Sequence, residues 1–421
     1  MNRLRLTRRG RTEGIAQGRT WDGVGYNTII LKLFLTDSRF FDCRQRALVA
    51  ECPHGVVEPG ESLVPFQRSA SAFNLTGLAS KEKIMALGVS FEILDLRHFA
   101  APTLRPVLEA EGEVWKRRLH WDYQSSARLL MQYLDNHMLP GFAAIEAGQV
   151  MGYSFCVYEE TKAVIGDVFA LPAKAPVSRL DFFSHPDPAA AHEIEGALLR
   201  HLFELLLNSP NVDRVESQLL VHPSGTHAAA FREAGFDIFR RLFMVQQLNE
   251  VRNMPEIRLP AGLELRGWRD EDLNPAGRLI SEAYRDHPDS LINDQYRSVR
   301  GSQRFLHNIV RYSGCGAFSA SVSLVVVERA SRELAAVLLG SRVSPQSGHI
   351  TQVCVHPKFR RHGLGRLLLS IAAYGFMRLG VSEISLTVTE ANATAIDLYL
   401  SEGFATAHSF DAAVWEREPL V

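Results

Sequence analysis

The fold is decided by residues 349–404, which read HITQVCVHPKFRRHGLGRLLLSIAAYGFMRLGVSEISLTVTEANATAIDLYLSEGF. Apolar, β-branched residues at 350–355 predict a buried strand that ends before Pro357. After a short loop, apolar residues recur at helical spacing, at Leu364, Leu367, Leu368 and Ile371. The stretch therefore predicts strand, glycine loop, helix, strand and helix, in that order.

The loop before the first helix predicts an anion site. A helix that begins on glycines leaves its first backbone N–H groups unpaired, and these donors bind phosphate together with the positive end of the helix dipole. Three arginines surround the same point, at Arg360, Arg361 and Arg366. Two other phosphate motifs do not fit, because there is no G-x-G-x-x-G and no Lys-Ser/Thr after the second glycine.

These residues resemble the acetyl-CoA-binding core of the GCN5-related N-acetyltransferases, the GNAT superfamily. Arg360, Gly363 and Gly365 match that family's phosphate loop, Arg/Gln-x-x-Gly-x-Gly/Ala. Asn392, Tyr399 and residues 403–404 match its later Asn…Ala…Tyr…Gly-Phe segment. Loop, helix, strand and second motif follow in the family's order and spacing, so the resemblance is specific.

The resemblance implies how acetyl-CoA is held. In this family the cofactor lies like an extra strand against a splayed fourth strand, here 350–355. Backbone groups of that strand bind the pantetheine and polarise the acetyl carbonyl, and the loop N–H groups take the pyrophosphate. The cofactor-binding residues implied are Val353, Cys354, Val355, Arg360, Arg361, His362, Gly363, Leu364, Gly365, Arg366 and Asn392.

The resemblance also makes Tyr399 the general acid, since a phenol can protonate the departing thiolate. The base is less well defined. The family's usual Glu is replaced by Gln352, an amide that cannot take up a proton. His349 would point to the opposite face of a regular strand unless a bulge intervenes, and Glu390 is a second candidate. A water chain, or an amine less basic than lysine, would remove the need for a strong base.

Composition sets the broad class. A chain of 421 residues with 46% hydrophobic and 22% charged residues predicts a soluble globular protein of two or three domains. The net charge of −1 gives no electrostatic indication of a nucleic-acid or membrane partner. Five cysteines without C-x-x-C spacing predict neither a zinc site nor a disulfide framework. We therefore expect a cytoplasmic protein with no metal.

The first 84 residues show no sustained period of 2 or 3.6. We expect either a poorly ordered extension or a mis-assigned start, because Lys81-Glu82 can be encoded as a ribosome-binding sequence before Met85. From there the sequence predicts a GNAT-like domain at 85–250, a linker at 251–262 and a catalytic domain at 263–421.

The two domains are predicted to be copies of one unit. Residues 168–172 align with 353–357, and residues 230–236 align with 398–404. The first copy has no glycine between Pro172 and Gly196, and Phe231 takes the place of Tyr399. We therefore expect a degenerate first copy that packs against the second and completes the substrate cleft or the core.

The predicted fold class is α/β with a mixed, mostly antiparallel sheet in each of two tandem GNAT-like domains. The predicted function is direct acetyl transfer from acetyl-CoA to a primary amine in a ternary complex. A CoA-binding sensor without turnover, or transfer of a longer acyl group, remains an alternative. The acceptor and the oligomeric state stay open. The carboxylates of Asp286, Asp289 and Asp294 would attract a cationic amine or belong to a solvated turn.

Overall fold

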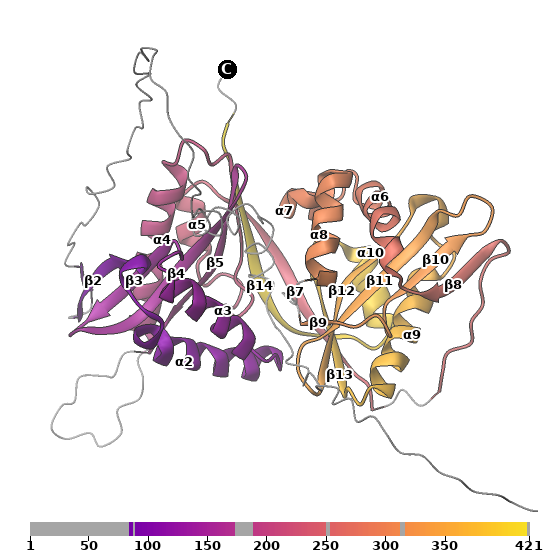
Figure 1. Ribbon diagram of the computed structural model, residues 1–421, viewed down its shortest axis with the longest axis horizontal. Coiled ribbons are helices and arrows are strands. Elements are labelled where there is room, and N and C mark those ends of the chain that lie inside the picture. Colours follow the sequence, from indigo (N-terminus) through magenta and orange to yellow (C-terminus); the bar gives the residue numbers. More distant parts are fainter. Residues whose placement is uncertain (1–83, 87–88, 173–187, 250–252, 312–315, 419–421) are drawn as a thin grey trace, which may run out of the picture.

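The computed structural model describes residues 84–86, 89–172, 188–249, 253–311 and 316–418. The expectation for residues 1–83, including the proposed start signal at Lys81-Glu82, lies outside the described residues. The described chain forms two α/β halves that share one sheet (Figure 1). Within these ranges no helix is long and apolar enough to cross a bilayer.

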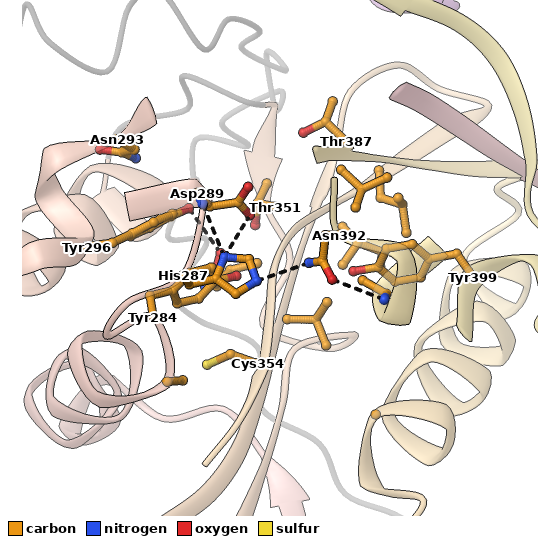
Figure 2. A pocket seen from close by; sticks show the side chains of 18 of the residues that line it. Tyr284, His287, Asp289, Asn293, Tyr296, Thr351, Cys354, Thr387, Asn392 and Tyr399 are labelled. Atoms are coloured by element: carbon orange, nitrogen blue, oxygen red, sulfur yellow. Dashed lines mark hydrogen bonds and ion pairs between the residues drawn. The ribbon is translucent and has the colours of Figure 1, made fainter. Parts of the chain in front are cut away.

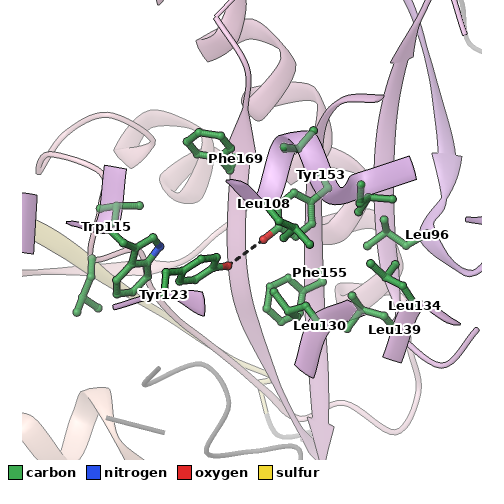
Figure 3. Packing of buried hydrophobic residues seen from close by; sticks show 14 of the residues in the cluster. Leu96, Leu108, Trp115, Tyr123, Leu130, Leu134, Leu139, Tyr153, Phe155 and Phe169 are labelled. Carbon is green, nitrogen blue, oxygen red and sulfur yellow. Dashed lines mark hydrogen bonds between the residues drawn. The ribbon is translucent and has the colours of Figure 1, made fainter. Parts of the chain in front are cut away.

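The N-terminal half combines strands and helices, as the predicted α/β class requires. Its strands are β1 (Ile84–Ala86), β2 (Val89–Asp95), β3 (Gly141–Glu146), β4 (Gln149–Glu159), β5 (Lys162–Ala170), β6 (Arg214–Gln218) and β7 (Asp237–Gln247). Its helices are α2 (Ala101–Leu119), α3 (Gln124–Asp135), α4 (Pro188–Leu207) and α5 (Ala228–Glu233). Helices α2 and α3 cover one face of the sheet through a core that includes Trp115, Tyr123 and Tyr153 (Figure 3). Helices α4 and α5 cover the other face.

The C-terminal half repeats the plan. Its strands are β8 (Leu263–Gly267), β9 (Ala317–Phe318), β10 (Leu324–Glu328), β11 (Leu334–Arg342), β12 (Ser347–Val355), β13 (Glu383–Thr389) and β14 (Ala405–Glu416). Its helices are α6 (Leu273–Ala283), α7 (Asp289–Ile292), α8 (Val299–Arg311), α9 (Leu364–Arg378) and α10 (Ala393–Ser401). Helices α9 and α10 lie on one face and α6 and α8 on the other. The predicted mixed α/β class is confirmed.

The last strand of each half lies in the sheet of the other half. The sheet order is β1-β2-β3-β4-β5-β6-β14-β7-β13-β12-β11-β10-β8. Strand β7 pairs with β13, β14 pairs with β6, and β7 and β14 pair with each other between the halves (Figure 1). The predicted units 85–250 and 263–421 therefore exchange strands, and their division into separate domains stays a prediction.

A buried ion network also joins the halves. Lys162 Nζ on β5 lies 2.6 Å from Asp294 Oδ1, in the 3-10 turn Asp294–Arg297, and 3.4 Å from carboxylate oxygens of both Glu159 and Glu216. Burial alone would raise the pKa of Asp294, but the contact with Lys162 outweighs it and the pKa is lowered. Asp294 is thus committed to Lys162 and is not available to attract a cationic amine.

Replacing Lys162 by Met is expected to lower the free energy of unfolding by about 3–5 kcal/mol, because three carboxylates lose their buried cation. Urea titration measures this value. Lys358→Met, which removes an exposed ion pair with Glu328, is the control and should change stability far less. Adding Asp294→Asn to Lys162→Met should recover part of the loss. Equal stability of the two lysine variants would contradict the assignment.

Candidate active site

A cavity of about 880 Å³ opens where the two parallel strands of the C-terminal half diverge. Strand β12 pairs with β13 only from Ser347 to His349. Beyond that point the β12 backbone faces the cavity, together with the start of α9 and one side of α10. The N-terminal half supplies the opposite wall from β5, β6 and β7, through Lys162, residues 164–166, residues 216–218 and Arg241. The expectation that the first copy completes the cleft agrees with this arrangement.

The glycine loop adopts the conformation that an anion site needs. Gly363, the residue before α9, has φ of 76°, a left-handed value that favours glycine, and no side chain caps the helix. A Cβ on Gly365 would lie 3.2 Å from Leu398, so glycine lets α9 approach α10 closely. Arg360 donates from Nη2 to the Ala283 carbonyl at 2.8 Å, which fixes the loop against α6. The first N–H groups of α9 thus face the cavity without a side-chain acceptor.

The structure brings the predicted site residues together, with one exception. All of them line the cavity except His362. The His362 ring turns back to the Arg360 carbonyl, 2.8 Å from its Nδ1, and the residue is exposed. Arg366 also has partners within the protein, since its guanidinium contacts Ser401 at 2.8 Å and Glu402 at 3.3 Å.

Tyr399 and Cys354 both stay protonated. Tyr399 projects its phenol into the cavity (Figure 2). Burial, with the nearby Asp289 as a smaller cause, raises the pKa of Tyr399 above its ordinary value. Burial likewise raises the pKa of Cys354 to about 12. A phenol of this kind keeps its proton and can donate it to the negative charge that develops on a leaving sulfur, while a thiol held neutral is a poor nucleophile.

His287 is a cavity residue that the sequence analysis missed. Its Nε2 lies 3.2 Å from Asn392 Nδ2, and its Nδ1 lies 3.1 Å from the Asp289 backbone nitrogen and 3.9 Å from Asp289 Oδ2 (Figure 2). The loop between α6 and α7 has no periodic pattern. In its Asp-His-Pro-Asp run, residues 286–289, the sequence pointed only to the two carboxylates as possible partners of an amine. Asn392 is engaged on both sides, because its Oδ1 accepts from Ala395 N at 3.2 Å.

A bulge in β12 changes which residues share a face. Gln352 lies opposite Leu339, whereas Ile350 lies opposite Gly340, so Thr351 is the extra residue. His349 and Gln352 therefore lie on the same face, unlike in a regular strand. Gln352 Oε1 accepts from the Tyr296 hydroxyl at 3.3 Å. His349 Nδ1 lies 3.0 Å from Ser385 Oγ, and its ring packs edge-on against Trp121.

The other acidic candidates differ in position. Glu390 forms an exposed ion pair with Arg240 at 3.6 Å and is not among the cavity-lining residues. Asp286 is exposed. Asp289 does line the cavity, where its Oδ1 accepts from the Thr389 hydroxyl. Of the predicted carboxylates, Asp289 is thus the one placed to meet a substrate.

The matching cleft in the N-terminal half is filled. Strands β5 and β6 pair from Lys162 to Ile165 and then diverge, as β12 and β13 do. There, His222 Nε2 lies 2.8 Å from the Val168 carbonyl, at the strand position that aligns with Val353. Phe231, in place of Tyr399, packs against Phe203 and Phe236. Among the described residues, His222 thus takes the β5 carbonyl to which a pantetheine arm would bind.

Comparison with known proteins agrees with this geometry. Residues 282–404 match the family model described as the acetyltransferase (GNAT) family. A tandem GNAT protein from the clavulanic acid biosynthesis pathway superposes with a TM-score of 0.52 at 16% identity, covering 79% of this chain and 100% of its own. A GCN5-related N-acetyltransferase from Sphaerobacter thermophilus gives the same score and identity, covering 79% and 97%. No curated protein sequence matches the chain. These matches confirm the predicted tandem GNAT fold.

Proposed function

The C-terminal half of this chain belongs to the GNAT family of acetyltransferases, and on that premise we propose that it moves an acetyl group from acetyl-CoA to a primary amine in a ternary complex. The observation that carries the proposal is the divergence of β12 from β13 over a cavity that contains both the α9 start and Tyr399. Its volume of about 880 Å³ is within the range of ligand pockets.

The cofactor would lie along the free edge of β12. The pyrophosphate binds the N–H groups at Gly363 to Arg366, where the helix dipole adds to the attraction. The pantetheine follows the backbone of residues 353–355. Asn392 faces the same arm after it gives up its contact with His287. Holding the thioester and the amine in one cavity makes the transfer effectively unimolecular.

Tyr399 supplies the proton that the departing CoA thiolate needs. The amine nitrogen attacks the thioester carbon, the C–S bond breaks, the sulfur takes the phenolic proton, and the proton that the newly acylated nitrogen loses restores the phenol. The amine must first lose a proton, because an alkylamine with a pKa of about 10.4 is neutral in only about one molecule in 10³ at pH 7. We assign this step to His287 on the cavity wall, which takes the proton on Nδ1 as the hydrogen bond from Asp289 N–H is released, with Asp289 Oδ2 3.9 Å away to offset the new charge.

The polar groups on β13 suggest the class of acceptor. Arg241 donates from Nη2 to Thr387 Oγ1 at 3.4 Å, while Asp289 binds the hydroxyl of Thr389 two residues further along. Arg241 and Asp289 thus reach neighbouring positions on the same face of β13, and both line the cavity. A small amine that also carries an anionic group fits this pair.

Amine-dependent release of CoA tests the proposal. The full chain is incubated with acetyl-CoA and a panel of primary amines, with and without a carboxylate or phosphate, and the free thiol is measured. We expect release that depends on the amine and is fastest for the anionic members. Acetyl-CoA binding without any amine-dependent release would contradict the enzyme and favour a sensor.

His287→Gln is expected to lower kcat/KM by about 10²–10⁴-fold at neutral pH, because the amine loses its proton acceptor. The loss should shrink as the pH rises, since the free-amine fraction grows about tenfold per unit below the amine's pKa. His356→Gln is the control, because His356 lies outside the cavity and pairs with Glu282 at 2.9 Å. If the pH profile of His287→Gln matched that of the unaltered enzyme, another group would be the base, and His349 would be the next candidate.

A further inference from the structure

Three histidines and a glutamate meet in the N-terminal half, at the point where β5 and β6 diverge. His192 and Glu195 lie one turn apart on α4, and His222 and His227 lie between β6 and α5. Glu195, His222 and His227 are buried, each with less than a tenth of its surface exposed. His192 is exposed and its ring stacks on that of His227, with centroids 5.2 Å apart.

The ligand atoms of this cluster are spaced as in a tetrahedral metal site. His227 Nε2 lies 3.3 Å from Glu195 Oε2 and 3.3 Å from His222 Nδ1, and the third edge, His222 Nδ1 to Glu195 Oε2, is 3.9 Å. Metal–ligand bonds of about 2.0–2.2 Å place tetrahedral ligands roughly 3.3 Å apart. The donor atoms of His192, Glu195 and His227 also lie within 4.8 Å of one another.

Backbone groups of β5 orient two of these ligands. His222 Nε2 must donate to the Val168 carbonyl at 2.8 Å, because a carbonyl oxygen only accepts, and this leaves a lone pair on Nδ1. Ala170 N donates to Glu195 Oε1 at 3.2 Å, so Oε2 is the oxygen turned toward the histidines. A hydrogen bond from the second ring nitrogen to a backbone carbonyl is typical of metal-bound histidine.

We propose that His192, Glu195, His222 and His227 bind one Zn²⁺ ion. Three imidazole nitrogens and one carboxylate oxygen form a closed tetrahedral site of the structural kind. His227 would then carry its proton on Nδ1, and His192, the exposed ligand, would turn inward to complete the shell. The ion would also balance the buried charge of Glu195, beside the buried carboxyl of Asp167, which lies 3.8 Å from His222 Nε2.

The site would replace the cofactor in the first copy. Val168 and Ala170 align with Val353 and Val355, the strand residues assigned to the pantetheine in the second copy. Zinc would fasten α4 and the segment before α5 to β5, where acetyl-CoA would otherwise hold the strands apart. The expectation of no metal was based on cysteine spacing. It did not weigh the His-x-x-Glu on α4 or the His-x₄-His of residues 222–227.

Metal binding by the full chain tests the site. After treatment with a chelator, the protein is titrated with Zn²⁺ by calorimetry, and Co²⁺ serves as a visible probe of coordination. His192→Ala removes an exposed ligand, and Glu195→Gln keeps the shape but removes the charge. His98→Ala, which deletes a surface histidine elsewhere, is the matched control.

We expect the unaltered chain and the His98→Ala control to bind one Zn²⁺ in this site. With Co²⁺ in place of Zn²⁺, both should show the intense absorption bands of a four-coordinate ion. His192→Ala and Glu195→Gln should each weaken that binding at least tenfold and lose those bands, and zinc should raise the thermal midpoint only where the four ligands are intact. Zn²⁺ affinity and Co²⁺ spectra that are the same in all four proteins would overturn the proposal. The cluster would then be a hydrogen-bonded network.

Discussion

Tyr399→Phe is expected to reduce kcat for acetyl transfer by about 10²–10⁴-fold with little change in acetyl-CoA affinity. The phenol projects into the cavity, and its raised pKa keeps the proton in place until a thiolate forms. Within the described part of the chain its hydroxyl has no hydrogen-bond partner, so phenylalanine removes the proton donor without leaving another group unpaired. Steady-state kinetics with the best amine of the panel measure the effect.

Tyr374→Phe is the matched control, because Tyr374 lies on α9 outside the cavity-lining residues. It should retain full activity. A Tyr399→Phe variant with the kcat of the unaltered enzyme would show that another group, or solvent, protonates the thiolate. The packing of the Tyr399 ring against Phe404, with centroids 5.9 Å apart, would then be its main role.

Gly363→Glu is expected to weaken acetyl-CoA binding by roughly 10²–10⁴-fold, the loss of two hydrogen bonds to a charged phosphate at about 1.5–3 kcal/mol each. The carboxylate would stand at the N-terminal end of α9, where the pyrophosphate binds. Gly380→Glu offers a close control at the other end of the same helix. Gly380 has φ of 77° against 76° at Gly363, and a Cβ at either position meets no atom within 4 Å.

The two variants therefore carry the same new charge and a similar backbone strain, and they differ in their distance from the cavity. Calorimetric titration should separate them, with Gly380→Glu binding acetyl-CoA as the unaltered protein does. Equal weakening in both would point to a general effect of the substitution on α9. If Gly363→Glu still bound acetyl-CoA tightly, the loop would not be part of the cofactor site.

The elements of residues 349–404 could be predicted because their patterns are local. The two helices predicted within this stretch correspond to Leu364–Arg378 and Ala393–Ser401 in the structure. Apolar residues at helical spacing and glycines at the loop determine these bounds wherever the segment packs. The meeting of Gln352, Asn392 and Tyr399 at one cavity also follows, since the family motif orders them around two diverging strands.

What could not be predicted depends on partners distant in sequence. Strand β14 begins at Ala405 and inserts between β6 and β7, so the last strand of the chain joins the two halves. Strand pairing uses backbone groups that every residue has, so local sequence does not say which edge a strand will meet. The bulge at Thr351 and the contact of His287 with Asn392 are likewise properties of the packed chain.

We expect that only the C-terminal one of the two copies binds acetyl-CoA. Calorimetric titration of the full chain with acetyl-CoA measures this as the number of molecules bound per chain. We predict one, because the C-terminal cleft is open while His222 and Phe231 fill its N-terminal counterpart. Two molecules per chain would contradict the filled cleft, and none bound by folded protein would contradict the acetyl-CoA site.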